Sequence, residues 1–335
     1  MLRALRLLVY RHRPFLPIAF ALVLAIGLTS CARTQPTTKA ILMLDWVPNT
    51  NHTGIYVALA KGYYKEQGLE LQIVEPGEGG SPEQVVAAGG ADFGISYQEF
   101  VTQARAEDVP VVSIAAIIQH NTSGFAAPKD KGIKRPKDFE GKRYGAFGSP
   151  TEKAMLTQLM KCDGADVEKV QFVDIGASDY FVATRRDVDF AWVFYGWTGI
   201  EAELRNEPQD MVMLSDWSHC VPDYYTPVII TSEKLIAEKP DLVRRFMAAT
   251  AKGYQYAISH PAESADILLK AAPENNPDLV RRSQEWLSPR YQADAPRWGE
   301  QKAEVWQRYA DWMADAGLLP KRVDTSKAFT NQFLP

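Results

Sequence analysis

Two short segments of the sequence concentrate aromatic and amide side chains in a way that suits the binding of a flat molecule. The first segment, residues 45–54, contains Asp45, Trp46, Asn49, Asn51 and His52. Asp and Asn can simply build turns, but an exposed indole on a loop needs a partner that covers its face. We therefore expect Trp46, Asn49 and His52 to contact a ligand.

The second segment, residues 192–201, reads Trp-Val-Phe-Tyr-Gly-Trp-Thr-Gly-Ile-Glu. It places several aromatic rings and an acid within ten residues. Side chains alternate along a strand, which places Trp192 and Phe194 on one side and assigns some of these rings to the core. Tyr195 and Trp197, near and beyond the end of the strand, are expected in a cleft.

Further candidates follow other predicted strands. Ser96 and Glu99 have the spacing of a capping box, which predicts Ser96 as the cap of a helix and leaves Tyr97 available for a ligand. His120 follows the fourth strand and is either a ligand contact or a turn residue. Tyr225 lies at a predicted hinge, and we expect it at the same cleft.

Gly148, Ser149 and Thr151 precede a predicted helix. Free N–H groups at a helix start favour a carbonyl, a phosphate or another acceptor on the ligand, although capping explains both hydroxyls equally well. Several rings with few charges favour a flat heteroaromatic ligand, each stack adding roughly 0.5–1.5 kcal/mol beyond burial. A sugar is also compatible. A sulfonate or phosphate is disfavoured because no arginine lies near these loops to form a bidentate clamp.

Charge and cysteine content exclude several classes of protein. The net charge is −4 without a long basic block, which argues against nucleic acid as a partner. Cys162 and Cys220 lack the spacing of a metal or redox motif, so we expect no metal and no cofactor. These two residues are either ordinary thiols or partners in one disulfide, a choice that the sequence leaves open. No catalytic triad order, Walker loop or HExxH helix is present in the sequence.

The beginning of the sequence predicts export. Arg3, Arg6, Arg11 and Arg13 precede an apolar run, residues 15–28, that is shorter than the about 20 residues of a comfortable membrane span. A single-pass anchor is the alternative. Leu28-Thr29-Ser30-Cys31 resembles the bacterial lipobox, so we expect residues 1–30 to be a lipoprotein signal peptide, Cys31 to carry the lipid anchor and residues 31–39 to form a tether. The chain would then lie on the periplasmic or extracytoplasmic face of a membrane.

The rest of the chain alternates short β-rich runs with helix-length segments, which is typical of an α/β fold with largely parallel sheets. About 305 residues remain after processing. A single hydrophobic core usually supports fewer residues than this, so two lobes are expected. Residues 124–128 and 224–227 are predicted hinges because the series changes lobe there. The aromatic stripes in residues 241–258 and 305–313 have helical spacing and predict core rather than a ligand site.

Three motifs carry a family resemblance. Residues 45–54, residues 91–97 (Ala-Asp-Phe-Gly-Ile-Ser-Tyr) and residues 189–197 resemble the NMT1/THI5-like periplasmic proteins, which bind thiamine pyrimidine precursors and are also grouped with SsuA-like proteins. The similarity runs from about residue 40 to residue 319. It implies a type II periplasmic-binding-protein fold, with lobe 1 formed by residues 40–125 and 226–335, lobe 2 by residues 126–225, and a ligand cleft between the lobes at a two-segment hinge.

The resemblance also implies a role and a ligand. It implies a binding lipoprotein that works with ABC permease and ATPase subunits and captures N-formyl-4-amino-5-aminomethyl-2-methylpyrimidine, or a related hydroxymethylpyrimidine, for thiamine salvage. Trp46, Tyr97 and Trp197 would stack on the ring, and Glu201 would read its aminopyrimidine edge unless it is a solvated helix residue. Related pyrimidine binders often have Trp where this chain has Phe147, which keeps riboflavin as an alternative ligand.

An enzyme is the rival class, because pyrimidine synthases share the fold implied by the resemblance. Those enzymes need a lysine and a histidine after the third strand and an iron-binding cysteine cluster. This chain has Ser96 and Phe100 at the first two positions and lacks such a cluster in its sequence. We therefore expect a binding protein and not an enzyme.

Overall fold

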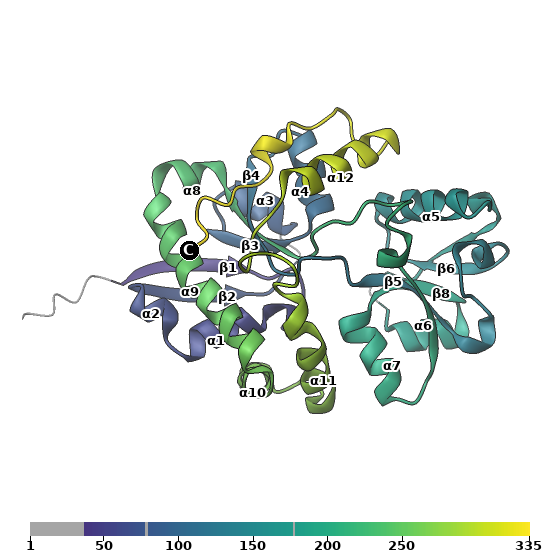
Figure 1. The fold of residues 1–335 in the computed structure, drawn as a ribbon, viewed down its shortest axis with the longest axis horizontal. Coiled ribbons are helices and arrows are strands. Elements are labelled where there is room, and N and C mark those ends of the chain that lie inside the picture. The colour runs from purple at the N-terminus through teal and green to yellow at the C-terminus, as the bar shows by residue number, and fades with distance from the viewer. Residues whose placement is uncertain (1–36, 78–79, 177) are drawn as a thin grey trace, which may run out of the picture. The chain divides into compact units, whose positions relative to one another are not determined.

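The computed structural model describes residues 37–77, 80–176 and 178–335 (Figure 1). The predicted signal peptide, Cys31 and most of the predicted tether lie outside the described residues. None of the helices in the described part of the chain has the length and apolar character needed to cross a bilayer.

The first sheet has five strands in the order β2-β1-β3-β10-β4. β1 is parallel to β2 and β3, whereas β10 is antiparallel to β3 and β4. The strands are β1 (Thr38–Met43), β2 (Leu69–Val74), β3 (Phe93–Ser96), β4 (Val111–Ala116) and β10 (Val228–Ser232). The sheet therefore joins a strand from late in the chain to four early ones.

The second sheet repeats this pattern in the order β7-β6-β8-β5-β9. β6 is parallel to β7 and β8, and β5 is antiparallel to β8 and β9. The strands are β5 (Ser123–Pro128), β6 (Arg143–Ala146), β7 (Gln171–Asp174), β8 (Phe190–Phe194) and β9 (Gln209–Met213). We call the part built on the first sheet the first lobe and the part built on the second sheet the second lobe.

Helices cover both faces of each sheet (Figure 1). In the first lobe they are α1 (Thr53–Ala60), α2 (Tyr63–Glu66), α3 (Pro82–Ala87), α4 (Gln98–Ala106), α8 (Glu233–Glu238), α9 (Pro240–Ser259), α10 (Pro261–Ala271), α11 (Pro277–Leu287) and α12 (Ala303–Asp315). In the second lobe they are α5 (Pro150–Cys162), α6 (Tyr180–Arg186) and α7 (Ile200–Leu204). α9 and α12 lie where the helical spacing of residues 241–258 and 305–313 predicts helices.

The predicted aromatic stripes are core. Phe246 and Tyr254 of α9 are buried against β1 and α1 in the first lobe. α12 serves both lobes, because Trp306 packs in the core of the first sheet while Tyr309 packs in that of the second. A close approach places α9 against α1, since a Cβ on Gly54 would lie only 2.3 Å from the ring of Tyr254.

The chain changes sheet twice, between β4 and β5 and again before β10. The predicted hinge at residues 124–128 is wrong, because these residues belong to β5, and the change of sheet occurs in residues 117–122. Gly124 instead permits close strand packing, since a Cβ there would lie 2.6 Å from the carbonyl oxygen of Val212 in β9. The predicted lobe boundary between residues 125 and 126 likewise falls inside β5, whereas residues 224–227 do lie in the second connection.

Cys162 at the end of α5 and Cys220 in the second connection form a disulfide, with Cα atoms 5.9 Å apart. The interpretation of both as ordinary thiols is therefore wrong. The sequence left the pairing open because 58 positions separate the two residues and only the fold brings them together.

Candidate ligand-binding site

A cavity of about 250 Å³ lies where the two lobes meet, at the carboxyl ends of β1, β3 and β8. Loops at this end of an α/β sheet are the usual place for a ligand. The lining residues from the first lobe are Asp45, Trp46, Asn49, Thr50, Asn51, Tyr97 and Leu287, and those from the connection and the second lobe are Thr122, Phe194, Gly196 and Trp197. We call this space the aromatic cavity.

The loop after β1, residues 44–52, is fixed by the helices behind it. The Asn49 side chain caps the turn that follows by accepting from the backbone N–H of Asn51. The hydroxyl of Tyr254 donates to the carbonyl oxygen of Asn51 at 2.6 Å, and that of Tyr291 donates to the carbonyl oxygen of Thr50 at 2.6 Å. This wall of the cavity is therefore preorganised, although its backbone belongs to a loop.

Asp45 is a buried carboxyl with two side-chain donors. Nδ1 of His52 accepts from the backbone N–H of Asn49 at 3.2 Å, so the ring proton is assigned to Nε2, which donates to Asp45 at 2.7 Å. The hydroxyl of Tyr97 donates to the other oxygen of Asp45. Burial alone would raise the pKa of Asp45, but the electrostatic effect of His52 and the hydrogen bonds from His52 and Tyr97 lower it below its usual range.

A pair of nearly parallel rings faces across the aromatic cavity. Tyr97 comes from the first lobe and Phe194 from the second, and their centroids are 6.4 Å apart with planes inclined by 18°. Trp46, which is 52% exposed, and Trp197 stand beside this pair. β8 ends at Phe194, and residues 195–199 then form a single wide π-helical turn, a feature often found at functional sites.

A second cavity of about 160 Å³ shares the rings of Tyr97 and Phe194 with the first. Its lining residues are Tyr97, Glu99, Phe100, Phe147, Ser149, Thr151, Trp192 and Phe194. Glu99 is its one carboxyl, and burial, assisted by the nearby Glu83, raises the pKa of Glu99 to about 8 against an opposing hydrogen bond from its own backbone N–H. We call this space the acid cavity.

The chain is similar in sequence to known protein families and in fold to solved structures. The family described as "NMT1/THI5 like" matches residues 49–264 of the chain. The formylaminopyrimidine-binding protein of Halalkalibacterium halodurans is 30% identical over 87% of this chain and 89% of its own.

The chain belongs to the NMT1/THI5-like family.

The chain is also similar to a protein that is named as an enzyme. The 4-amino-5-hydroxymethyl-2-methylpyrimidine phosphate synthase of Legionella pneumophila is 26% identical over 91% of this chain and 95% of its own. Among solved structures, the alkanesulfonate-binding protein SsuA of Xanthomonas axonopodis pv. citri bound to MOPS superposes with a TM-score of 0.66 at 15% identity, covering 88% of this chain and 99% of that one. The family member described here thus has the periplasmic-binding-protein fold, with two α/β lobes.

Several of the predicted site residues of this family member meet at the two cavities. Trp46, Asn49 and Trp197 line the aromatic cavity, Ser149 and Thr151 line the acid cavity, and Tyr97 lines both. Gly148 lies in the same turn as Ser149, with a left-handed φ of 95°. Ser149 also caps α5, as the sequence predicts.

Other predicted site residues are engaged elsewhere. Glu201 pairs with Arg205 one turn along α7 and lines neither cavity. Tyr225 is buried, and its hydroxyl accepts from the backbone N–H of Lys302. His52 is fully buried behind Asp45.

His120 lies at the connections between the lobes, outside the lining of both cavities. Its imidazole lies 2.6 Å from Asp223 and 2.8 Å from Asp294. The hydrogen bond to Asp223, with further help from Asp294, raises the pKa of His120 to about 9 against a smaller opposing effect of burial. His120 therefore joins the two connections instead of facing the cleft.

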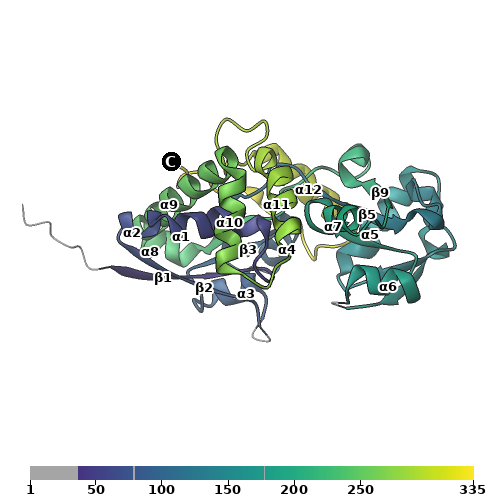
Figure 2. The same cartoon turned by 90° about the horizontal axis from the view of Figure 1, so that it is seen from below.

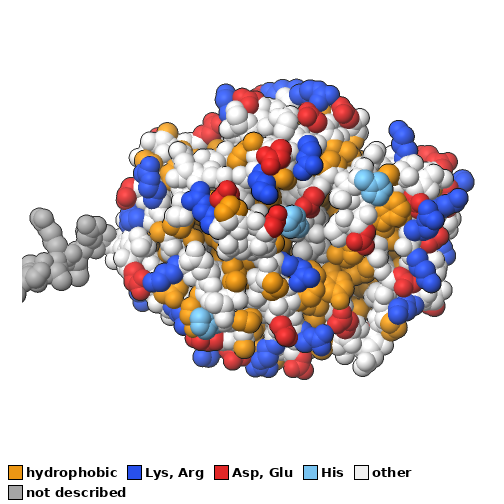
Figure 3. Space-filling view, in the orientation of Figure 1, with side chains coloured by type: hydrophobic (Ala, Val, Ile, Leu, Met, Phe, Trp, Pro, Cys, Tyr) orange, Lys and Arg blue, Asp and Glu red, His pale blue; other side chains and the backbone are white. Residues whose placement is uncertain are grey.

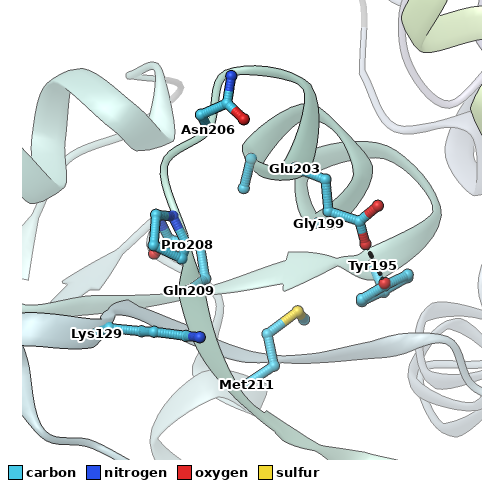
Figure 4. A pocket seen from close by; sticks show the side chains of 9 residues that line it. Lys129, Tyr195, Gly199, Glu203, Asn206, Pro208, Gln209 and Met211 are labelled. Atoms are coloured by element: carbon cyan, nitrogen blue, oxygen red, sulfur yellow. Dashed lines mark hydrogen bonds between the residues drawn. The ribbon is translucent and has the colours of Figure 1, made fainter.

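Tyr195 lines a different, open groove of about 570 Å³ on the second lobe (Figure 4). The hydroxyl of Tyr195 donates to Glu203, as the dashed line in Figure 4 shows, and its ring packs against Trp286 of α11. α11 and α7 lie side by side in both views (Figures 1 and 2). Despite its larger volume, this groove is lined by the second lobe alone and lacks the facing rings of the cleft.

Sequence reasoning missed several cavity residues, Phe194 and Trp192 among them, and misassigned a cap. Phe194 and Trp192 were grouped with possible core residues, whereas both line the acid cavity. The predicted capping box at Ser96 is wrong, because Tyr97 occupies the cap position and the Ser96 hydroxyl donates to Glu83. Glu99 therefore lies at the second position of α4, outside a capping box, and its carboxyl accepts a hydrogen bond from its own backbone N–H.

Proposed function

We propose that this protein captures a planar nitrogen heterocycle outside the cytoplasm and delivers it to an ABC importer. The observation that carries the proposal is the nearly parallel pair of Tyr97 and Phe194, one ring from each lobe, at the meeting point of the two cavities. Stacking between two such faces selects flat, aromatic guests. The 30% identity to a formylaminopyrimidine-binding protein supports a thiamine pyrimidine precursor as the guest.

A small opening between the lobes is enough to admit the ring. A ring in contact with both partners needs their planes about 7–8 Å apart, twice the usual contact distance of about 3.5–4.0 Å. The centroids of Tyr97 and Phe194 are 6.4 Å apart. We infer that the lobes rotate about the two connections to admit the ligand and close on it, which is the usual hinge motion of two-lobed binding proteins.

Large apolar side chains are exposed on both lobes near the cleft. Hydrophobic side chains reach the surface where the two lobes meet (Figure 3). Trp46 of the first lobe and Phe147 of the second are both large and half exposed, at 52% and 50%. A ligand that fills the cleft would cover such surfaces, which explains why they are tolerated in the free protein.

Export and lipid anchoring at Cys31 are part of the proposal. The disulfide between Cys162 and Cys220 supports an oxidising compartment, where such bonds persist. Mass spectrometry of the protein from membranes should find diacylglycerol on an N-terminal Cys31. An unprocessed N-terminus would contradict this part of the proposal.

Calorimetric titration of the processed chain without its lipid tests the ligand. We expect formylaminopyrimidine to bind, with riboflavin as the alternative. Phe194→Ala should weaken binding by about 1–3 kcal/mol, because one face of the slot between Tyr97 and Phe194 is lost. Phe172→Ala is the matched control, because Phe172 is an exposed ring of the same sheet outside both cavities. Failure of both compounds to bind would remove the assignment of the ligand.

A further inference from the structure

Glu99 is a buried carboxyl whose hydrogen-bonding capacity the fold leaves partly unused. It is 8% exposed, it lines the acid cavity, and its Oε2 is buried without a hydrogen-bond partner. An unpaired buried polar atom is costly, and in a native protein it points to a strained or functional site.

No cation of the described residues is among the groups that act on the pKa of Glu99. The groups that act on it electrostatically, or on which it acts, are Glu83 of α3, Tyr97 at the start of α4, Tyr224 of the second connection and Tyr309 of α12. All of them are acids or phenols. Burial raises the pKa of Glu99 to about 8 against an opposing hydrogen bond from its own backbone N–H, and Glu83 adds to the rise, so its carboxyl is mostly protonated at neutral pH. A protonated carboxyl offers an O–H donor beside a carbonyl acceptor.

We propose that the acid cavity binds the edge of the ligand, and that Glu99 pairs with a hydrogen-bond acceptor and a donor that lie side by side on a neutral heterocycle. This inference rests on the proposed function, because it takes the ring to lie between Tyr97 and Phe194. Both rings line both cavities, so a guest held between them extends into each. An amidine edge, such as a ring nitrogen beside an amino group, and a lactam edge both provide the required pair.

The sizes of the cavities support a guest that spans them. Small-molecule sites usually measure roughly 300–1,000 Å³. The aromatic cavity, at about 250 Å³, and the acid cavity, at about 160 Å³, each fall below this range, whereas together they fall within it. The ring therefore occupies the slot while its polar edge reaches Glu99.

The same chemistry excludes anions from the acid cavity. Its lining consists of rings, two hydroxyl side chains and Glu99, without a lysine or arginine. A sulfonate or phosphate offers only acceptors and would bring a full charge beside a group whose own ionisation is already suppressed. The cleft thus differs in substrate class from the alkanesulfonate-binding protein that shares the fold.

The pH dependence of binding tests this role without any substitution. A pair of this kind needs the proton on Glu99, so the affinity for formylaminopyrimidine should be level near neutrality. Above about pH 8 it should fall by about tenfold per pH unit, as free Glu99 ionises. Calorimetry from about pH 6.5 to about pH 9.5 measures this directly. Binding that stays equally tight across this range overturns the role of Glu99 and leaves the proposed function standing.

Two substitutions sharpen the test. Glu99→Gln keeps a donor and an acceptor side by side without a titrating proton, so it should bind within a few-fold of the parent at neutral pH and lose the fall above about pH 8. Glu99→Met keeps the volume without the polar pair and should bind at least about thirtyfold more weakly. Glu107→Gln, an exposed residue at the end of the same helix, is the control and should match the parent.

The possible failures are distinguishable. If the parent protein binds neither formylaminopyrimidine nor riboflavin at any pH, the proposed function fails. If it binds one of them and Glu99→Met binds equally well, only the role of Glu99 fails. Methanesulfonate serves as the anionic probe, and its binding in competition with the heterocycle would overturn the assigned substrate class.

Discussion

Asp45 and Glu99 are two buried carboxyls that flank the same tyrosine and differ in charge. Asp45 receives hydrogen bonds from His52 and Tyr97, which lower its pKa despite burial. Glu99, two residues beyond Tyr97, has an oxygen without a partner, and burial, assisted by Glu83 and only partly opposed by the backbone N–H of Glu99, raises its pKa to about 8. Burial is common to both, and the supply of donors decides which of them ionises.

This difference separates two tasks within one cleft. The negative charge of Asp45 acts within the protein, because its hydrogen bond with the Tyr97 hydroxyl holds the Tyr97 ring in the orientation that faces Phe194. The Oε2 atom of Glu99 has no partner in the protein and is available to a ligand. A binding site can therefore contain a rigid ionised support and a neutral recognition group that share a single aromatic side chain.

The largest expected effect comes from removing the charge of Asp45. Asp45→Asn leaves two donors facing an amide, so the free energy of unfolding near neutral pH should fall by about 3–5 kcal/mol. Because the folded pKa is lowered, this stabilisation exists above the unfolded pKa and disappears as the pH falls through the folded pKa. The loss should therefore shrink in acid when measured by urea unfolding.

Asp241→Asn is the control for this experiment. Asp241 is an exposed carboxyl paired with Arg245 on α9, and its loss should cost less than about 0.5 kcal/mol. If Asp45→Asn were as mild as this control, the contrast between the two buried carboxyls would be lost.

The second effect has the opposite sign. The folded pKa of Glu99 is raised, so the unfolded chain releases this proton first and Glu99 destabilises the fold increasingly from about pH 4.5 to about pH 8. Glu99→Gln removes this penalty. Its stability relative to the parent should grow by about 3 kcal/mol between about pH 5 and about pH 8 in urea unfolding. A constant difference across this range would show that Glu99 ionises as easily as an exposed acid.

The smallest effect falls on the shared tyrosine. Tyr97→Phe keeps the ring and removes the donor to Asp45, so stability should fall by about 2 kcal/mol, typical of a hydrogen bond to a charged group. Affinity for the ligand should fall only a few-fold because the stacking face remains. Tyr63→Phe, on α2 outside the cleft, provides the baseline. A loss of affinity as large as that of Phe194→Ala would assign a direct ligand contact to the hydroxyl.

Local sequence signals predicted the framework but not the acid cavity. The loop after β1 and the turn at Ser149 were found because their polar residues act within a few positions of one another. The spacing of Ser96 and Glu99 matched a cap equally well. Pairing with Val228 of β10 extends β3 through Ser96, so the helix begins one residue later than the pattern indicates. That partner lies far along the chain and is invisible to a local pattern.

The part of the cleft that the second lobe provides was also only partly predictable from local sequence patterns. Strand alternation correctly grouped Trp192 with Phe194 but could not say which face of the sheet borders a cavity. The π-helical turn at residues 195–199 then changes the helical register. Glu201 therefore faces Arg205 along α7 instead of joining the lining of either cavity.

The return of β10 to the first sheet bears on the order of folding. All strands of the second sheet lie within residues 123–213, so the sheet itself can form once that stretch has been synthesised, although its core is completed only by α12. The first sheet needs β10 between β3 and β4, and its covering helix α9 comes later still. The residues made first must therefore wait until much of the chain is complete, and the slot between Tyr97 and Phe194 is assembled last.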